Sequence, residues 1–156
     1  NLKIALGNAI DLFNNNNLNE CIEQLEEILT IHPANLKVLN MLLDTNIKIN
    51  KAAEALKIIK KLIRLEPNKK EHQEKLIKVH QFLNDDQAYQ SALIEFHKNF
   101  PSIQTARIIS NIHIENDREE ESDQVIQNFF ESDKTYGELY KGIRHVKAGR
   151  LKLAEE

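Results

Sequence analysis

The sequence predicts an all-α fold built from repeats. The first observation is that its only three prolines, Pro33, Pro67 and Pro101, are evenly spaced. Their period of about 34 positions is typical of helical repeat proteins. The second observation is composition, since 4 Gly and 3 Pro in 156 residues are too few for the many tight turns of an all-β fold.

The third observation is a shared apolar pattern before two of the prolines. Segments 18–29 and 52–63 align without a gap, and apolar or small residues recur at i, i+4 and i+7 in both. This spacing forms one face of an amphipathic helix. The aligned pairs are Cys21 with Ala55, Leu25 with Ile59, Ile28 with Leu62, and Leu29 with Ile63.

These residues resemble the tetratricopeptide repeat, and the resemblance covers nearly the whole chain. Cys21 and Ala55 match the small residue early in the family's second helix, where the two helices approach closely. The prolines match the residue that follows the second helix. The resemblance implies antiparallel helix pairs wound into a right-handed alpha-alpha superhelix. The family's usual Trp and Gly are absent from their positions in the first helices of the first two repeats.

The period divides the chain into repeats at about 2–35, 36–69 and 70–103. In the third repeat we expect a first helix at about 70–83 and a second at about 86–99. Ala88 falls one place before the expected small residue and Tyr89 occupies that position, which indicates a one-residue slip.

The remaining repeats are less regular. A fourth is expected at about 104–134, with Ser102 as the N-cap of its first helix. A partial fifth follows at 135–156, in which Gly149 is a candidate helix cap. We therefore expect residues 1–156 to form a single solenoid that is a fragment of a longer protein.

Composition and charge exclude several classes of protein. The net charge of −3 does not favour a nucleic-acid partner, and one cysteine cannot form an intramolecular disulfide. No apolar run approaches the roughly 20 residues that span a bilayer, so direct membrane insertion is not expected. The compartment, cytoplasmic or periplasmic, is left open.

The sequence contains no pattern typical of an enzyme or a metal site. No phosphate-binding glycine loop or nucleophile elbow is present, and no histidine pair has a metal-ligand spacing. All six histidines are therefore interpreted as solvated or half-buried structural residues. Cys21, flanked by Glu20 and Glu23, is interpreted as a buried apolar thiol. We expect no catalysis, no cofactor and no metal in this segment.

Charge is distributed unevenly along the chain. A predicted second helix carries a basic block, which consists of Lys51, Lys57, Lys60, Lys61 and Arg64. Second helices form the convex surface in the tetratricopeptide family. Because no aromatic residues are interleaved with this block, a solvated surface is favoured over a nucleic-acid site.

First helices line the concave groove of tetratricopeptide proteins, and that groove usually holds a peptide or a partner's helix. The resemblance therefore implies a partner-binding groove with apolar residues at its ends and charged residues between them. Its expected residues are Leu6, Ile10, Phe13, Asn40, Met41, Asp44, Lys48, Glu74, Lys75, Lys78, Ile108 and Ile112. Some of the apolar residues could instead pack against a neighbouring repeat.

One subtype of the family binds the C-terminal carboxylate of a chaperone tail through basic and asparagine side chains. The matching positions here are Leu6, Ile10, Met41, Glu71 and Lys75, and only Lys75 fits. Chaperone-tail binding is therefore disfavoured. The regular asparagine ladder of some peptide-backbone binders is also missing.

The predicted function is a non-catalytic scaffold that binds a protein or peptide in its concave groove. One alternative is a repeat domain of a larger bacterial protein, involved in envelope-polymer assembly or export or attached to a glycosyltransferase or sulfotransferase. Another is a homo-oligomeric scaffold. The sequence does not identify the partner.

Overall fold

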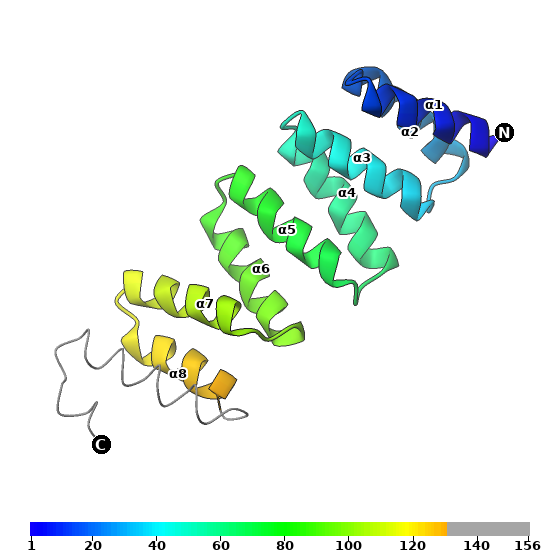
Figure 1. Cartoon of the computed structure of the whole chain (residues 1–156). Helices are drawn as coiled ribbons and strands as arrows, with labels where there is room; N and C mark the ends of the chain where they lie inside the picture. The colour runs from blue at the N-terminus through cyan, green and yellow to red at the C-terminus, as the bar shows by residue number, and fades with distance from the viewer. Residues whose placement is uncertain (131–156) are drawn as a thin grey trace. The chain divides into compact units, whose positions relative to one another are not determined.

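A computed structural model of the chain describes residues 1–130, and within them the secondary structure is entirely helical. In chain order the helices are α1 (Leu2–Asn14), α2 (Leu18–Ile31), α3 (Leu36–Lys48), α4 (Ala52–Leu65), α5 (Lys70–Phe82), α6 (Asp86–Asn99), α7 (Ile103–Glu115) and α8 (Glu119–Phe130) (Figure 1). Among the described helices, α1 and α2, α3 and α4, and α7 and α8 pack closely together as the predicted pairs, whereas α5 and α6 are not among the closely packed pairs.

The helix ends lie where the sequence places them. Helices α2, α4 and α6 each end two residues before a proline, which cannot continue the backbone hydrogen bonds of a helix. At the start of α3, the Asn35 side chain accepts a hydrogen bond from the Val38 amide. Ser102 accepts one from the Thr105 amide and is the N-cap of α7, as predicted.

The turn within each helix pair uses a left-handed residue. Asn16, Asn50, Asn84 and Asp117 have φ values of 63°, 61°, 52° and 58°. Asn and Asp tolerate this backbone region better than other residues with a β-carbon, because their short side chains can bond locally to the backbone. The turns therefore follow from residue type at a fixed place in the repeat.

We expect Asn50→Val to lower the free energy of unfolding by about 1–2 kcal/mol, because a β-branched residue is strained at positive φ. Asn50→Gly should change it by less than about 0.5 kcal/mol, since glycine adopts this conformation readily. Urea denaturation followed by circular dichroism measures both values. Equal losses from the two variants would contradict a conformational cause.

The one-residue shift in the repeat does not lie where the sequence predicted it. Helices α5 and α6 begin one full period after α3 and α4, so the third repeat keeps the register. Helices α7 and α8 both begin one position short of a full period after α5 and α6. The predicted slip within the third repeat is therefore wrong, and half-buried Tyr89 occupies the position of Cys21 and Ala55 without displacing the helix start.

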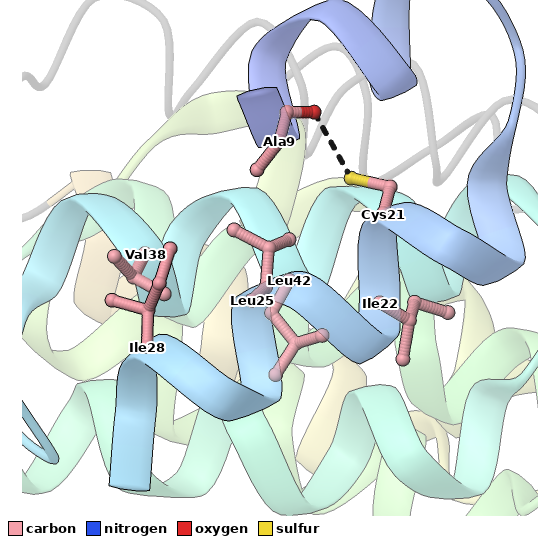
Figure 2. Close-up of a cluster of buried hydrophobic side chains, with 7 residues drawn as sticks. All are labelled: Ala9, Cys21, Ile22, Leu25, Ile28, Val38 and Leu42. Carbon is pink, nitrogen blue, oxygen red and sulfur yellow. Dashed lines mark hydrogen bonds between the residues drawn. The ribbon is translucent and has the colours of Figure 1, made fainter. Parts of the chain in front are cut away.

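The chain divides into two compact units, residues 1–92 and 93–156. The first unit has two clusters of buried apolar side chains. Figure 2 shows the first cluster, in which residues of α1, α2 and α3 meet: Ala9, Cys21, Ile22, Leu25, Ile28, Val38 and Leu42. The second joins α3, α4 and α5: Leu39, Leu43, Ala55, Ile59, Leu62 and Val79. Helix α3 contributes to both clusters and therefore links the first two repeats.

The second unit has a smaller described core in which Ala106 of α7 meets Ile126 of α8. Ser110 and Ser122 are fully buried between the same helices, and their hydroxyl oxygens lie 2.6 Å apart. Two small hydroxyl residues therefore provide a close approach of helices there, and satisfy each other as hydrogen-bond partners. The predicted fifth repeat, with Gly149, lies outside the described residues, and a single continuous solenoid stays a prediction.

None of the helices within residues 1–130 is both long enough and apolar enough to cross a bilayer.

Candidate protein-interaction face

Ten of the twelve predicted groove residues lie on α1, α3 and α5 of the first unit. We call these ten the first-helix face: Leu6, Ile10, Phe13, Asn40, Met41, Asp44, Lys48, Glu74, Lys75 and Lys78. The other two, Ile108 and Ile112, lie on α7 of the second unit. The structure places Ile108 in solvent and Ile112 half-buried within that unit.

The first contact across this face joins α1 and α3. The Lys48 ammonium nitrogen lies 4.8 Å from the centre of the Phe13 ring. A cation at this distance from a ring is attracted by the negative charge on the ring face, an effect worth about 0.5–1 kcal/mol at an exposed site. The contact also places the aromatic ring of Phe13 beside the positive charge of Lys48 on this face.

The second contact joins α3 and α5. The Lys75 ammonium donates to Asp44 Oδ1 at 2.6 Å, between residues 31 positions apart. Both side chains are partly exposed, so the pair contributes at most about 1 kcal/mol to stability. Since Asp44 and Lys48 are four apart on α3, the two contacts form one continuous row across three helices.

The apolar members of the face are less available than the sequence suggested. Leu6, Phe13 and Met41 are half-buried and pack against the first core cluster. They serve the stacking of the repeats at least in part, which is the alternative that the sequence left open. Ile10 is half-buried and is absent from that cluster. A β-carbon added to Gly7 would meet nothing within 4 Å, so the surface near the middle of α1 is open.

The remaining polar members differ in their partners. Asn40 donates to the Leu36 carbonyl in its own helix, at 2.8 Å. Glu74 lies 3.7 Å from the ammonium of Lys70, four residues before it. Lys78 is exposed and makes no ion pair with any residue of the described segment. Two cations of the face, Lys48 and Lys78, therefore make no ion pair with the described residues, and of these Lys48 contacts the Phe13 ring.

The geometry adds to the argument against chaperone-tail binding. Lys75, the one residue that matched the carboxylate-binding pattern, already donates to Asp44. A carboxylate ligand would have to displace that partner and would approach exposed Glu71 one turn away.

Among the five histidines within residues 1–130, two are more buried than expected, and His145 lies outside the described residues. His72 and His80 are 1% and 8% exposed, which corrects their interpretation as solvated or half-buried. His72 occupies the repeat position of Val38. Its Nε2 lies 2.8 Å from Glu66 Oε2, directly after the end of α4. A polar residue with a polar contact therefore replaces the apolar residue of the preceding repeat. Over residues 1–130, no three His, Cys, Asp or Glu side chains are grouped to hold a metal ion.

Cys21 is a core residue and no nucleophile. It is fully buried, and its thiol donates to the Ala9 carbonyl at 3.3 Å (Figure 2). Burial raises the pKa of the Cys21 thiol, which a hydrogen bond with Thr45 opposes only in part. The thiol therefore stays protonated at neutral pH.

We expect Cys21 in the folded chain to react with a soluble thiol reagent on the order of a hundredfold more slowly than in the unfolded chain, because reaction requires local opening. Absorbance of the released chromophore, with and without denaturant, measures the two rates. Equal rates would contradict burial of this residue.

The residues of the first-helix face were predicted from the sequence, but the contacts between them were not. Both contacts join neighbouring repeats, at offsets close to the repeat period. A search for opposite charges, or for a cation and an aromatic ring, at offsets within about one helical turn of the period would have found them.

Comparison with known proteins identifies the fold. No family model matches the chain, and no curated protein matches it closely enough to count as a relative. Among solved structures, one described as MamA protein has a TM-score of 0.64 at 15% identity and covers 98% of this chain and 85% of that chain. MamA AMB-1 has a TM-score of 0.65 at 20% identity and covers 86% of this chain and 74% of that one.

A third match is MamA from Desulfovibrio magneticus RS-1, with a TM-score of 0.61 at 12% identity, over 86% of this chain and 77% of that chain. MamA is a tetratricopeptide-repeat protein. At these identities the likeness shows the fold, which is a tetratricopeptide-type solenoid of helix pairs.

Proposed function

We propose that the chain is a protein-interaction scaffold, and that its first-helix face binds a peptide or helix of a partner protein. The observation that carries the proposal is the row of exposed and half-buried side chains across α1, α3 and α5, with Ile10 and Phe13 at one end and Lys75 and Lys78 at the other. This fold is typical of such scaffolds.

The chemistry of the row favours a partner segment with two features. An apolar side chain fits the open surface at Gly7, one helical turn before half-buried Ile10, where burial of apolar area contributes to binding. An acidic side chain fits Lys78, which is exposed and makes no ion pair with the described residues. The Asp44–Lys75 pair adds a fixed negative and a fixed positive charge to the row, which favours partners whose charges are placed to match them.

The test is affinity capture of partners from the native host by the chain and by the triple variant Asp44→Ala, Lys75→Ala, Lys78→Ala. Binding of each captured partner is then measured with purified protein. Removing two positive charges and one negative charge at the face should weaken binding about 10- to 100-fold, as expected for loss of positioned charged contacts.

A matched control removes the same charges away from the face. Lys51→Ala, Glu95→Ala and Lys98→Ala are exposed positions on a turn and on α6. The control variant should bind the partner as well as the original chain does. A partner that both variants hold equally would place the interaction outside the first-helix face and refute the proposal.

A further inference from the structure

The outer surfaces of α2 and α4 carry opposite charges at equivalent places. Helix α2 exposes Glu23, Glu26 and Glu27, and we call these three the acidic strip. Helix α4 carries Lys57, Lys60 and Lys61 at the equivalent positions of the next repeat, and we call these the basic strip. All six are exposed except Lys61, which is half-buried.

The strips stand at the same height on neighbouring repeats. The two helices are equal in length, and each strip occupies the sixth, ninth and tenth positions. Both helices also pack against α3, α2 in the first cluster of buried side chains and α4 in the second. Because they begin one repeat period apart, α2 and α4 are equivalent elements of successive repeats within one unit.

Within each strip, the charges repel one another. Residues three and four apart on a helix face are neighbours, and like charges there destabilise the helix. Lys57 is relieved by Glu54 at 2.9 Å, but the acidic strip, Lys60 and Lys61 form no ion pair with residues 1–130. A partner that brings an opposite charge to each strip would relieve this repulsion.

The arrangement is self-complementary. A two-fold axis that runs between α2 and α4, parallel to both, would place the acidic strip of one copy opposite the basic strip of the other, twice. Because the strips stand at equal height, Glu23 would face Lys57 of the second copy, and Glu26 would face Lys60. Interfaces with this symmetry are the commonest in soluble oligomers.

Other occupants fit the surface less well. A polyanion such as a nucleic acid or an anionic bilayer would be attracted by the basic strip and repelled by the acidic strip beside it. The charge pattern also does not continue to α6, where the equivalent residues are Ser91, Ile94 and Glu95. The opposite charges are thus confined to α2 and α4, the two helices that the two-fold symmetry requires.

We propose that two copies of this chain associate through the acidic strip of α2 and the basic strip of α4, in a weak, salt-sensitive dimer. Exposed ion pairs are individually weak, and salt screens them. This interface is separate from the first-helix face, so partner binding and self-association are independent properties.

The test is sedimentation velocity of the whole chain at about 50 mM and about 500 mM salt, where the screening length falls severalfold. We expect dimer at low salt and monomer at high salt. Two charge-reversal variants should each be monomeric at both salt concentrations. The first reverses the acidic strip (Glu23→Lys, Glu26→Lys and Glu27→Lys), and the second reverses the basic strip (Lys57→Glu, Lys60→Glu and Lys61→Glu). Each should weaken self-association at least about tenfold, since every facing pair becomes repulsive.

Two mixtures then separate charge pairing from misfolding. An equimolar mixture of the two reversed variants should form a heterodimer, because one then carries two basic strips and the other two acidic ones. The six-residue reversal keeps the net charge of −3 and should form its own dimer, but should not mix with the original chain. The proposal would be overturned if the original chain were a monomer at low salt, or if a dimer persisted in a variant with only one of the two strips reversed.

Discussion

Replacing Leu43 by alanine should lower the free energy of unfolding by about 2–5 kcal/mol, the range for removing a buried leucine side chain and leaving a cavity. Leu43 is fully buried in the cluster that joins α3, α4 and α5. Domains have total stabilities of about 5–15 kcal/mol, so the loss is a large part of what holds the first unit together. Urea denaturation followed by circular dichroism measures it.

The matched control is Ile31→Ala, which removes a comparable apolar side chain that is 75% exposed. Its effect should stay within about 0.5 kcal/mol, because no buried contact is lost. Hydrogen exchange adds a test of where the effect acts. Contacts in repeat proteins are local, so Leu43→Ala should speed exchange in α3–α5 and leave α7 and α8 nearly unchanged. Uniform acceleration throughout would contradict this locality.

Much of the fold was predictable because the same residue types recur at the same positions of successive repeats. The prolines mark the ends of second helices, and Cys21 and Ala55 mark the close approach of each helix pair. Each is a local rule, a residue that cannot continue a helix or one small enough to fit, and the structure obeys both. Agreement between independent local rules is what makes a sequence specify one fold.

The misplaced slip shows where such reasoning fails. Tyr89 stands where the first two repeats have a small residue, and a shift of register was the simplest way to keep that rule. The structure keeps the register and buries Tyr89 in part. A large residue at this position therefore does not require a shift of register, and Asn84 adopts the same left-handed turn conformation as Asn16 and Asn50.

The site was predictable only as a set of positions. Which apolar members are used for stacking depends on burial, as with Leu6 and Met41, and periodicity alone cannot distinguish a core contact from an open one. The Phe13–Lys48 and Asp44–Lys75 contacts depend on the spacing between neighbouring repeats. The repeat period limits these pairs to a few candidate offsets, and packing between the repeats selects which of the candidates meet.

Buried histidines make the fold sensitive to acid. Burial lowers the pKa of His80, and Lys60 lowers it further while Asp85 opposes the shift. Burial also lowers the pKa values of His97 and His113, the second with a contribution from Arg118 that Glu121 opposes. Nδ1 of both His80 and His113 is buried without a hydrogen-bond partner among the described residues.

The direction of the pH effect follows from these pKa values. A histidine in the unfolded chain binds a proton near about pH 6.5, whereas the folded chain resists protonation until lower pH. Between the folded pKa and about pH 6.5, the unfolded state therefore binds more protons than the folded state. The stability that these neutral histidines contribute is fully present above about pH 6.5 and is lost as the pH falls toward the folded pKa. The lowered pKa of Glu66, caused first by its hydrogen bond with His72, acts in the same direction nearer about pH 4.

We therefore expect the Tm of the chain to fall between about pH 7.5 and about pH 5, where each loss of about 1 kcal/mol corresponds to roughly 2–4 °C for a chain of this size. His80→Asn tests the cause, because Asn46 stands at the same position one repeat earlier and donates to the carbonyl four residues before it at 2.8 Å. The variant supplies a polar group that does not titrate and can make that same bond. Its Tm at about pH 7.5 should be close to that of the original chain, and its Tm should fall less than that of the original chain when the pH is lowered to about 5. An unchanged pH dependence would assign the acid sensitivity to groups other than His80.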